Sequence, residues 1–318
     1  MFDIFYYEKG SVKRGDVKDL GKLKKKQLWV DVTNITKKEE DILKTVFNLH
    51  PLTIEDLLHS QTRIKVEEFP NYLFCVFYGV QEKEHIEIME LDFVLGRNFF
   101  ISNHLDEIKT FSELKNNPLK LASLFKQGND FIFHYLLDIQ VDNFFPVLDH
   151  IDDRIEVIEE RVTKHISSHI MKDILDMKRL IILVKRTALP QRDKLSYLRM
   201  GNYAYISKDA IPYFRDIYDH AIRVCDAIDN YREAIANTFD VYMSAVNNNT
   251  NEIMKMLSIV ATIALPLTVL SSIYGTNFTN LPGKDIPNGF WIMIIMMIII
   301  SGMMFHYFYR KGWIRIVI

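Results

Sequence analysis

Cysteine is scarce in this sequence. Among 318 residues there are two, Cys75 and Cys225, and neither belongs to a CxxC pair. Both lie in apolar contexts, so we expect two buried thiols in a reducing compartment rather than a disulfide. His165 and His169 stand four apart on a predicted helix. No third ligand with suitable spacing accompanies them, so a metal site is not expected there.

Motifs of the common enzyme classes are also missing. The chain has no P-loop, no GxSxG, no HExxH and no GxGxxG, which argues against an enzyme. It has no basic stripe with interleaved aromatic residues of the kind that indicates a nucleic-acid partner. Residues 1–16 contain acids and no apolar core of signal-peptide length. We therefore expect the large N-terminal part to stay in the cytosol.

Charge is missing from one long stretch near the C-terminus. No charged side chain lies between Lys255 and Lys284, although charged residues make up 25% of the chain. As a helix, Met256–Tyr274 would span about 28 Å, roughly one hydrocarbon core. A second uncharged run covers Phe290–Tyr309. The two runs predict a membrane hairpin at the end of a chain of otherwise soluble composition.

The distribution of positive charge predicts how this hairpin is oriented in the membrane. The C-terminal tail contains Arg310, Lys311 and Arg315 and no acid, whereas the loop between the two runs contains only Lys284 and Asp285. Because positive residues favour the cytosolic side of a membrane, we expect the loop outside and both termini in the cytosol. The predicted localisation is the cell (inner or plasma) membrane, with a multi-pass topology.

Short runs of β type alternate with helical ones in the first 145 residues. The strand-like runs are 27–32, 71–78, 86–95 and 99–102. Thr36 and Glu39 form a capping-box pattern that begins a helix. The predicted fold class is an α+β (α/β) cytosolic domain, followed by long stalk helices and two C-terminal transmembrane helices. The expected domains are 1–145 (α/β), 146–255 (helical stalk) and 256–318 (transmembrane, with its extracellular loop at 275–289).

Helical periodicity replaces the strand pattern from about residue 129. One later segment is predicted at 168–189, ending before Pro190. A single helix is predicted for Ile211–Tyr274, because no proline occurs between its first turn and Pro266. Its length would be on the order of 95 Å. A monomer gains little from so long a helix, whereas a bundle of several copies gains a stalk continuous with a pore.

One face of this long helix is polar or small along most of its length. Steps of three and four residues place on this polar stripe Asp240, Ser244, Asn247, Asn251, Met254, Ser258, Ala261, Leu265, Thr268 and Ser272. Polar groups are costly in hydrocarbon unless they meet one another or water. Two interpretations stay open. The stripe packs against other helices, or several copies form a water-lined pore in which Met254 and Leu265 are apolar rings that gate by dewetting.

The stripe carries no carboxylate within the membrane. A cation would therefore pass without giving up its water to acids. Carbonyl, amide and hydroxyl oxygens can hydrogen-bond the hydration shell instead. Such a pore suits Mg²⁺, which dehydrates reluctantly and keeps several waters. The spacing alone does not single out Mg²⁺.

Several motifs resemble the CorA family of magnesium and other divalent-cation transporters. Residues 240–282 contain TNEIMKMLSIVATIALPLT followed by YGTNF, which is similar to the stalk end, first membrane helix and signature loop of that family. Residues 212–220 (PYFRDIYDH), 50–56 (HPLTIED) and 63–69 (RIKVEEF) also match. The resemblance covers almost the whole chain and is strongest over 209–282.

The resemblance implies a homopentameric funnel in a lipid bilayer, with a central pore formed by the first membrane helix. Gly275 and Asn277 match a ring at the outer entrance, where Asn277 would hold the hydrated ion. Thr276 replaces the methionine of the family's Gly-Met-Asn signature, which leaves Co²⁺, Ni²⁺ and Zn²⁺ open beside Mg²⁺ as transported ions. Further pore positions implied by the resemblance are Asp240, Asn251, Met254, Leu257, Leu265 and Thr268.

A regulatory Mg²⁺ site in the cytosol is implied as well. Asp216 matches a carboxylate of a site between subunits that would sense internal Mg²⁺ and close the pore. Asp92 or Glu90 is the candidate for its acidic partner. The predicted function is a Mg²⁺ channel gated by cytosolic Mg²⁺. The alternatives are a Co²⁺, Ni²⁺ or Zn²⁺ transporter of the same family, or a membrane-anchored sensor or scaffold without flux.

Acids are crowded on one predicted helix. They are Asp149, Asp152, Asp153, Glu156, Glu159 and Glu160. They form either a solvated helix face or an acidic brush that draws cations from the pore mouth into the cytosol.

Overall fold

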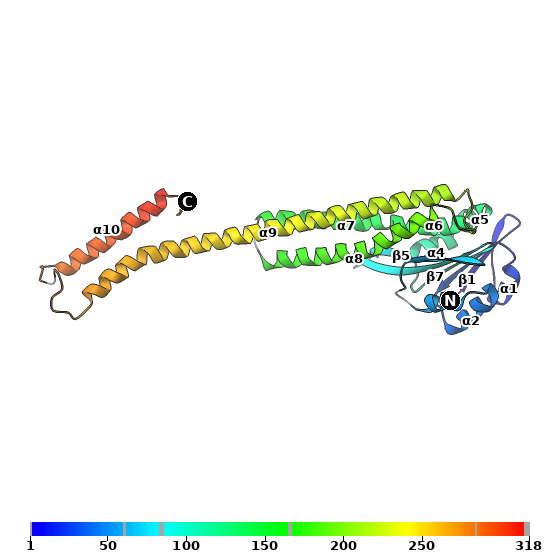
Figure 1. Cartoon of the computed structure of the whole chain (residues 1–318), viewed down its shortest axis with the longest axis horizontal. Helices are drawn as coiled ribbons and strands as arrows, with labels where there is room; N and C mark the ends of the chain where they lie inside the picture. The colour runs from blue at the N-terminus through cyan, green and yellow to red at the C-terminus, as the bar shows by residue number, and fades with distance from the viewer. Residues whose placement is uncertain (1, 60–61, 83–85, 165–166, 284, 315–318) are drawn as a thin grey trace. The chain divides into compact units, whose positions relative to one another are not determined.

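The computed structural model describes residues 2–59, 62–82, 86–164, 167–283 and 285–314 (Figure 1). The chain divides into an N-terminal unit, residues 1–161 with 167–239, and a C-terminal unit, residues 162–166 with 240–318. The long helix α9 contributes to both units. The division into 1–145, 146–255 and 256–318 stays a prediction.

The N-terminal unit begins with strands and short helices and continues with long helices. The strands are β1 (Phe2–Glu8), β2 (Ser11–Arg14), β3 (Leu28–Thr33), β4 (Lys65–Phe69), β5 (Tyr72–Glu82), β6 (Ile86–Gly96) and β7 (Phe99–His104). The short helices are η1 (Val17–Asp19), α1 (Leu20–Leu23), α2 (Lys37–Phe47), α3 (Pro51–Leu58), α4 (Lys109–Lys115), α5 (Pro118–Gln127) and α6 (Asn129–Asp142). The long helices are α7 (Phe144–Lys164), α8 (Ser168–Leu198) and α9 (Ile211–Tyr274).

All strands belong to one sheet, in the order β2-β1-β3-β7-β6-β5-β4. The central neighbours β3 and β7 are parallel, and the other pairs are antiparallel. β7 is buried along its whole length and β3 along all but its last residue, as expected for strands covered on both faces. The predicted strands are confirmed, with β5 continuing to Glu82.

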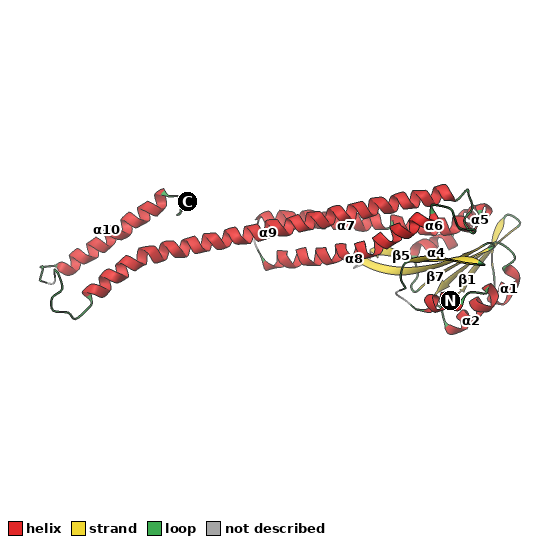
Figure 2. Ribbon diagram, in the orientation of Figure 1, coloured by secondary structure: helices red, strands yellow, loops and turns green. Residues whose placement is uncertain are grey.

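Helices cover both faces of this sheet (Figure 2). On one face, Val30 and Ile101 belong to a core with Phe47 of α2. On the other, Trp29 belongs to a second core with Phe111 of α4 and with residues of α5 and α6. Adjacent residues of β3 enter different cores because successive side chains of a strand point to opposite faces. The predicted α/β class is therefore confirmed.

Two local predictions in this unit are also confirmed. The Thr36 backbone N–H donates to the Glu39 carboxylate (2.8 Å), and the two residues form the capping box of α2. Cys75 and Cys225 are free and buried.

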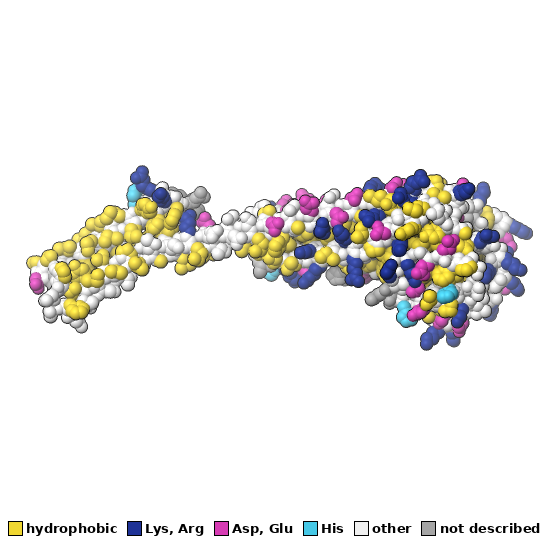
Figure 3. Space-filling model, in the orientation of Figure 1, with side chains coloured by type: hydrophobic (Ala, Val, Ile, Leu, Met, Phe, Trp, Pro, Cys, Tyr) yellow, Lys and Arg dark blue, Asp and Glu magenta, His cyan; other side chains and the backbone are white. Residues whose placement is uncertain are grey.

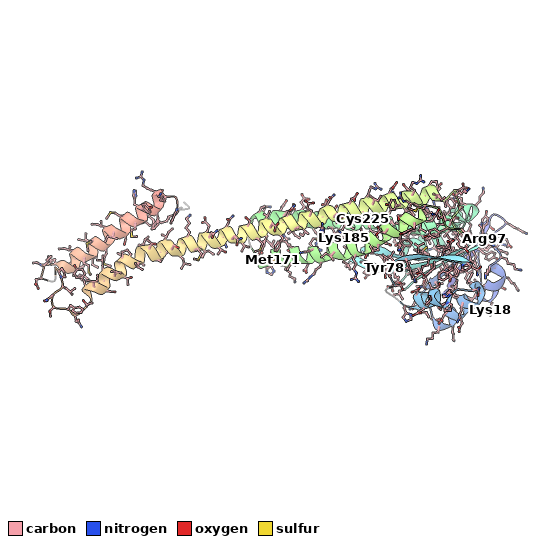
Figure 4. The ribbon with its side chains drawn as sticks, viewed as in Figure 1. Lys18, Tyr78, Arg97, Met171, Lys185 and Cys225 are labelled. Carbon is pink, nitrogen blue, oxygen red and sulfur yellow. The ribbon has the colours of Figure 1, made fainter. Side chains whose placement is uncertain are left out.

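Helices α7, α8 and the first part of α9 lie side by side (Figure 1). Val147, Ile151, Ile155 and Ile158 form the buried face of α7, at the helical spacing read from the sequence. Lys185 of α8 pairs with Asp229 of α9 (2.5 Å). Figure 4 labels Lys185 on α8 and Cys225 on the facing helix α9.

The prediction that the second helical segment ends before Pro190 was wrong. α8 continues to Leu198 with Pro190 in its interior. Proline inside a helix costs about 3 kcal/mol through a lost hydrogen bond and a clash. Here Leu195 and Leu198 are fully buried in the core, and the buried Gln191 side chain accepts a hydrogen bond from the Tyr78 backbone N–H (2.7 Å). These contacts with the sheet offset the cost of the proline.

The prediction of one helix over Ile211–Tyr274 is confirmed by α9. The C-terminal unit adds α10 (Gly289–Arg310). Among the described residues, α9 and α10 are the two helices long and apolar enough to cross a membrane. Hydrophobic side chains cover most of the visible face of α10 (Figure 3).

Candidate functional site

The polar stripe of α9 faces outward in the single chain. Every position from Asp240 to Ser272 that was assigned to it is exposed. The three apolar side chains predicted for constrictions are among the most exposed of their type: Met254 is 60%, Leu257 62% and Leu265 67% accessible. Apolar side chains this open on a membrane helix are positioned to contact lipid or another subunit.

A different face of α9 is turned toward α10. The least exposed positions in its membrane part are Ile259, Ile263, Pro266, Leu267 and Leu270. A cavity of about 730 Å³ is lined by Lys255, Ile259 and Ile263 of α9 and by Phe305 of α10. At roughly 100° per residue, this face centres about 150° away from the stripe. The stripe therefore does not pack α9 against α10 of the same chain.

Hydroxyl groups on α9 are held by the helix itself. Ser258 donates to the Met254 carbonyl (2.8 Å), and Thr268 donates to the Ala264 carbonyl (2.9 Å). Each hydroxyl hydrogen is thus used within the helix, while the oxygen lone pairs stay available as acceptors. Acceptors of this kind can receive hydrogen bonds from the water around a cation.

The turn after α9 contains Gly275, Thr276 and Asn277. The Gly275 N–H donates to the Ser271 carbonyl (2.9 Å), and a Cβ on Gly275 would lie 3.0 Å from that oxygen. The Thr276 hydroxyl donates to the Ile273 carbonyl (2.8 Å), so it caps the last turn of the helix. A side chain at position 275 would crowd this turn, which explains why a glycine occupies that position.

Asn277 is exposed, and no hydrogen bond to another residue in the described part of the chain holds its amide. With Thr276, Phe278 and residues of α10 it lines a hollow of about 490 Å³. The amide is free to meet a hydrated ion. Arg310 and Lys311 lie at the far end of α10, while Lys284 and Arg315 are outside the described residues.

Asp216 is exposed on α9, and its carboxylate lies near a group of possible metal ligands. Asp138 and Asp142 of α6 and His220 of α9 place one ligand atom each within 4.8 Å of one another. His220 Nδ1 lies 2.7 Å from the Asp142 carboxylate and 3.9 Å from that of Asp138. Its Nε2 lies 3.9 Å from the Asp216 carboxylate. Three carboxylates therefore surround one imidazole.

Burial, followed by the neighbouring Asp142 charge, raises the pKa of Asp138 to about 6, although the nearby His220 opposes the shift. Asp138 Oδ1 has no hydrogen-bond partner among the described residues. A carboxylate that is difficult to charge alone is stabilised by a bound cation.

The resemblance named Asp216, whereas Asp138, Asp142 and His220 were not predicted as its neighbours. The signal is present as two pairs spaced four residues apart, one on each helix. Spacing of four puts both members of a pair on one helix face. That the two faces meet depends on the packing of α6 against α9, across 78 positions of sequence for Asp142 and His220.

The two candidate partners of Asp216 lie on β6. Asp92 is 4% exposed and receives a hydrogen bond from the Asn103 amide (2.8 Å). Burial raises its pKa well above the usual range. The Glu90 carboxylate accepts from the Thr62 N–H (2.9 Å) and the Tyr78 hydroxyl (3.1 Å). A partnership of either with Asp216 of another subunit stays a prediction.

The crowded acids of α7 are all exposed, from Asp149 to Glu160. Glu159 accepts a hydrogen bond from the Thr238 hydroxyl (3.0 Å). Exposure fits both the solvated-face and the brush interpretation. Of the two spaced histidines, His169 is exposed on α8 and His165 lies outside the described residues.

Comparison with known proteins gives one family. The family model described as CorA-like Mg²⁺ transporter protein matches residues 24–310. A cobalt/magnesium transport protein CorA of Thermotoga maritima is 33% identical over 293 residues, covering 90% of this chain and 83% of that protein. A magnesium transport protein CorA of Campylobacter jejuni is 22% identical over 311 residues, covering 90% of this chain and 91% of that protein.

The fold also has a solved counterpart. The complete structure of the CorA magnesium transporter from Methanocaldococcus jannaschii superposes with a TM-score of 0.85 and covers 99% of each chain. The identity is 23%, so this likeness concerns the fold.

Proposed function

The chain belongs to the CorA-like Mg²⁺ transporter protein family, and we propose that it is a divalent-cation channel, above all for Mg²⁺. Five copies surround a central pore in the cell (inner or plasma) membrane, and both termini lie in the cytosol. Each copy contributes α9 to the wall of the pore and α10 to the outer layer.

The polar stripe on the free face of α9 supports this function best. Its positions are exposed and lie about 150° from the face turned toward α10. Polar side chains left facing hydrocarbon would be costly, so the stripe needs water or another polar surface. Copies arranged around a common axis supply both. Hydroxyl and amide oxygens then pass a cation with its hydration shell.

The ends of the pore have different chemistry in this proposal. Gly275, Thr276 and Asn277 form the outer entrance, where five Asn277 amides hold the hydrated ion. Thr268 and Asn251 form polar rings further in, and Asp240 forms an acidic ring in the stalk. Met254, Leu257 and Leu265 form apolar constrictions that close the pore by dewetting.

Internal Mg²⁺ regulates the channel through the group around Asp216. Asp138, Asp142 and His220 give that site ligands within one chain. Mg²⁺ bound there offsets carboxylate repulsion and favours the closed state. Co²⁺, Ni²⁺ and Zn²⁺ are further candidate cargoes, because Thr276 replaces the methionine of the signature.

Ion uptake into proteoliposomes tests the function. Protein reconstituted alone should take up Mg²⁺, and comparison with Co²⁺, Ni²⁺ and Zn²⁺ ranks the ions. Asn277→Ala should abolish Mg²⁺ uptake and leave assembly intact, because it removes the only side-chain amide of the signature turn. Wild-type uptake by this variant would contradict the assignment of Asn277 to the outer entrance. Absence of flux for every ion would favour a membrane-anchored sensor or scaffold.

A further inference from the structure

At the centre of the sheet, the segments that follow two neighbouring parallel strands pack on opposite faces. The parallel strands β3 and β7 are neighbours. Leu43 and Phe47 of α2, which follows β3, pack on one face, whereas Phe111 of α4, which follows β7, packs on the other. In α/β sheets, ligands bind outside the carboxyl ends of strands at such a divergence. The carboxyl ends of β3 and β7 are therefore a place to look for a ligand site.

A small cavity of about 50 Å³ lies at these ends. It is lined by Asn34 and Ile35 after β3, His104 and Leu105 at the end of β7, Leu57, Leu58 and His59 at the end of α3, and Glu90, Asp92 and Asn103. A hollow of about 220 Å³ shares Glu90, His104 and Leu105 with it. The small cavity therefore adjoins space in which waters fit.

Two buried oxygens in the lining have no partner. Among the described residues, Asp92 Oδ1 and Asn103 Oδ1 receive no hydrogen bond. The orientation of Asn103 is fixed, because its amide nitrogen donates to the Leu57 carbonyl (3.0 Å) and to Asp92 Oδ2 (2.8 Å). A flipped amide would place its oxygen against both of these acceptors. Both orphan atoms are thus acceptors, and buried acceptors are rarely left unpaired.

Two carboxylate side chains belong to the lining of the cavity. Asp92 and Glu90 both line it. The nearby Lys65 ammonium is already engaged by Asp56 (2.5 Å) and Glu67 (3.4 Å). The His104 ring is held by the Asp31 carboxylate (3.1 Å) and the Asp106 carbonyl (2.6 Å), so both of its nitrogens are already engaged. The two orphan acceptor oxygens therefore suit a cation, which would favour the charged form of Asp92.

We propose that this cavity binds a hard divalent cation, Mg²⁺ or Mn²⁺, through Asp92 Oδ1 and Asn103 Oδ1, with Glu90 reached through water. A complete shell of six waters needs on the order of 180 Å³ at about 30 Å³ each, so the ion loses waters on its inner side. It keeps the others toward the larger hollow, as Mg²⁺ usually does. The site lies within one subunit. Asp92 is then a ligand of this site rather than the partner of Asp216. This site goes beyond the proposed channel function and does not depend on it.

Anomalous scattering from Mn²⁺ gives the direct test. Crystals of the full chain grown without divalent cations and soaked in Mn²⁺ should show an anomalous peak within coordination distance of Asp92 Oδ1 and Asn103 Oδ1. A soaked crystal with peaks at other sites and none here would overturn the proposal. In that outcome a water and a protonated Asp92 occupy the cavity.

Thermal unfolding of the full chain gives a second test, in an Asp138→Asn, Asp142→Asn, Asp216→Ala background that removes the acidic ligands of the other candidate site. Saturating Mg²⁺ should raise the unfolding midpoint by about 3 °C or more. Asp92→Asn should abolish this shift and, without divalent cations, should be at least as stable as its parent. Asp56→Asn is the matched control, because it removes an equal charge nearby without lining the cavity, and it should keep the shift. An equal shift in Asp92→Asn and its parent contradicts the proposal.

Discussion

At the scale of single residues, Asn277 combines exposure with neutrality. Its amide is exposed and unengaged in the described part of the chain, while the neighbouring Thr276 hydroxyl is used to cap α9. A neutral amide can hydrogen-bond the waters of an ion without replacing them. Conduction requires binding that is favourable enough for entry and weak enough for exit. A neutral ring satisfies both conditions better than a charged one.

Asn277→Asp tests this balance. Five carboxylates at the entrance should bind Mg²⁺ more tightly, lowering the concentration for half-maximal uptake by a factor on the order of ten. The maximal rate should fall because the ion leaves more slowly. Initial rates of uptake into proteoliposomes measure both. Asn280→Asp adds the same charge to the same loop outside the signature turn, and it should change neither quantity to this extent. A raised maximal rate in Asn277→Asp would contradict the argument.

His134 shows how a buried residue couples stability to pH. Burial lowers its pKa to about 4, although the Tyr213 backbone and two acids oppose the shift. The unfolded chain takes up this proton near pH 6.5, so folding stability is present above that pH and is lost as the pH falls toward 4. The loss is at most about 3 kcal/mol. Unfolding midpoints from pH 7.5 to 4 should fall less steeply in His134→Gln. His169→Gln, at an exposed histidine, should follow the wild type.

At the scale of elements, the membrane part of α9 has two faces with different surroundings. The face with Ile259 and Ile263 is turned toward α10, and the stripe is free. Within the stripe, Met254 and Leu265 are apolar interruptions, both strongly exposed in the single chain. In the proposed pentamer, such side chains would meet their own copies around the axis. A narrow apolar ring excludes water, and with it the ion.

Polar substitution of the rings should open the pore. Met254→Asn or Leu265→Ser should allow ion leak at high internal Mg²⁺, because a wetted ring no longer blocks the ion. Fluorescent measurement of uptake at fixed internal Mg²⁺ checks this. Leu267→Ser puts the same polar group into the same helix on the face away from the stripe, and it should not leak. Unchanged flux in both stripe variants would mean that the stripe packs against other helices instead.

Patterns local in sequence were sufficient for β3, β5, β6, β7, α2 and the long helices, whereas β1, β2, β4 and the other short helices before residue 129 were not predicted. The continuous periodicity of Ile211–Tyr274, without an interior proline before Pro266, predicted α9 to the residue. Pro190 misled because its local preference is overridden by contacts of Gln191 and Leu195 with a sheet distant in sequence. The residues around Asp216 were missed for the same reason. No local sequence pattern predicts that α6 packs against α9 beside His220.

At the scale of the whole molecule, the proposed regulation requires that the group around Asp216 respond to the state of the assembly. Within one chain, Asp138, Asp142 and His220 could hold a metal ion, and the Asp216 carboxylate lies 3.9 Å from the other nitrogen of His220. A ligand shifts an equilibrium between open and closed states only through different affinities for the two. A carboxylate supplied by the neighbouring subunit in the closed state alone would give that difference.

The last prediction concerns this coupling. In Asp216→Ala, the Mg²⁺ concentration that gives half-maximal protection of the cytosolic part from proteolysis should rise about tenfold or more. Allosteric coupling typically changes an affinity about 5–150-fold, so a rise of this size is expected. Conduction itself should persist, because Asp216 lies far along α9 from the stripe's membrane part. Asp138→Asn should act in the same direction, since it removes a ligand of the same site. Asp219→Asn, an exposed acid three residues further along α9, should keep wild-type protection. If Asp216→Ala retains both full protection and Mg²⁺-dependent closure, the sensor lies elsewhere.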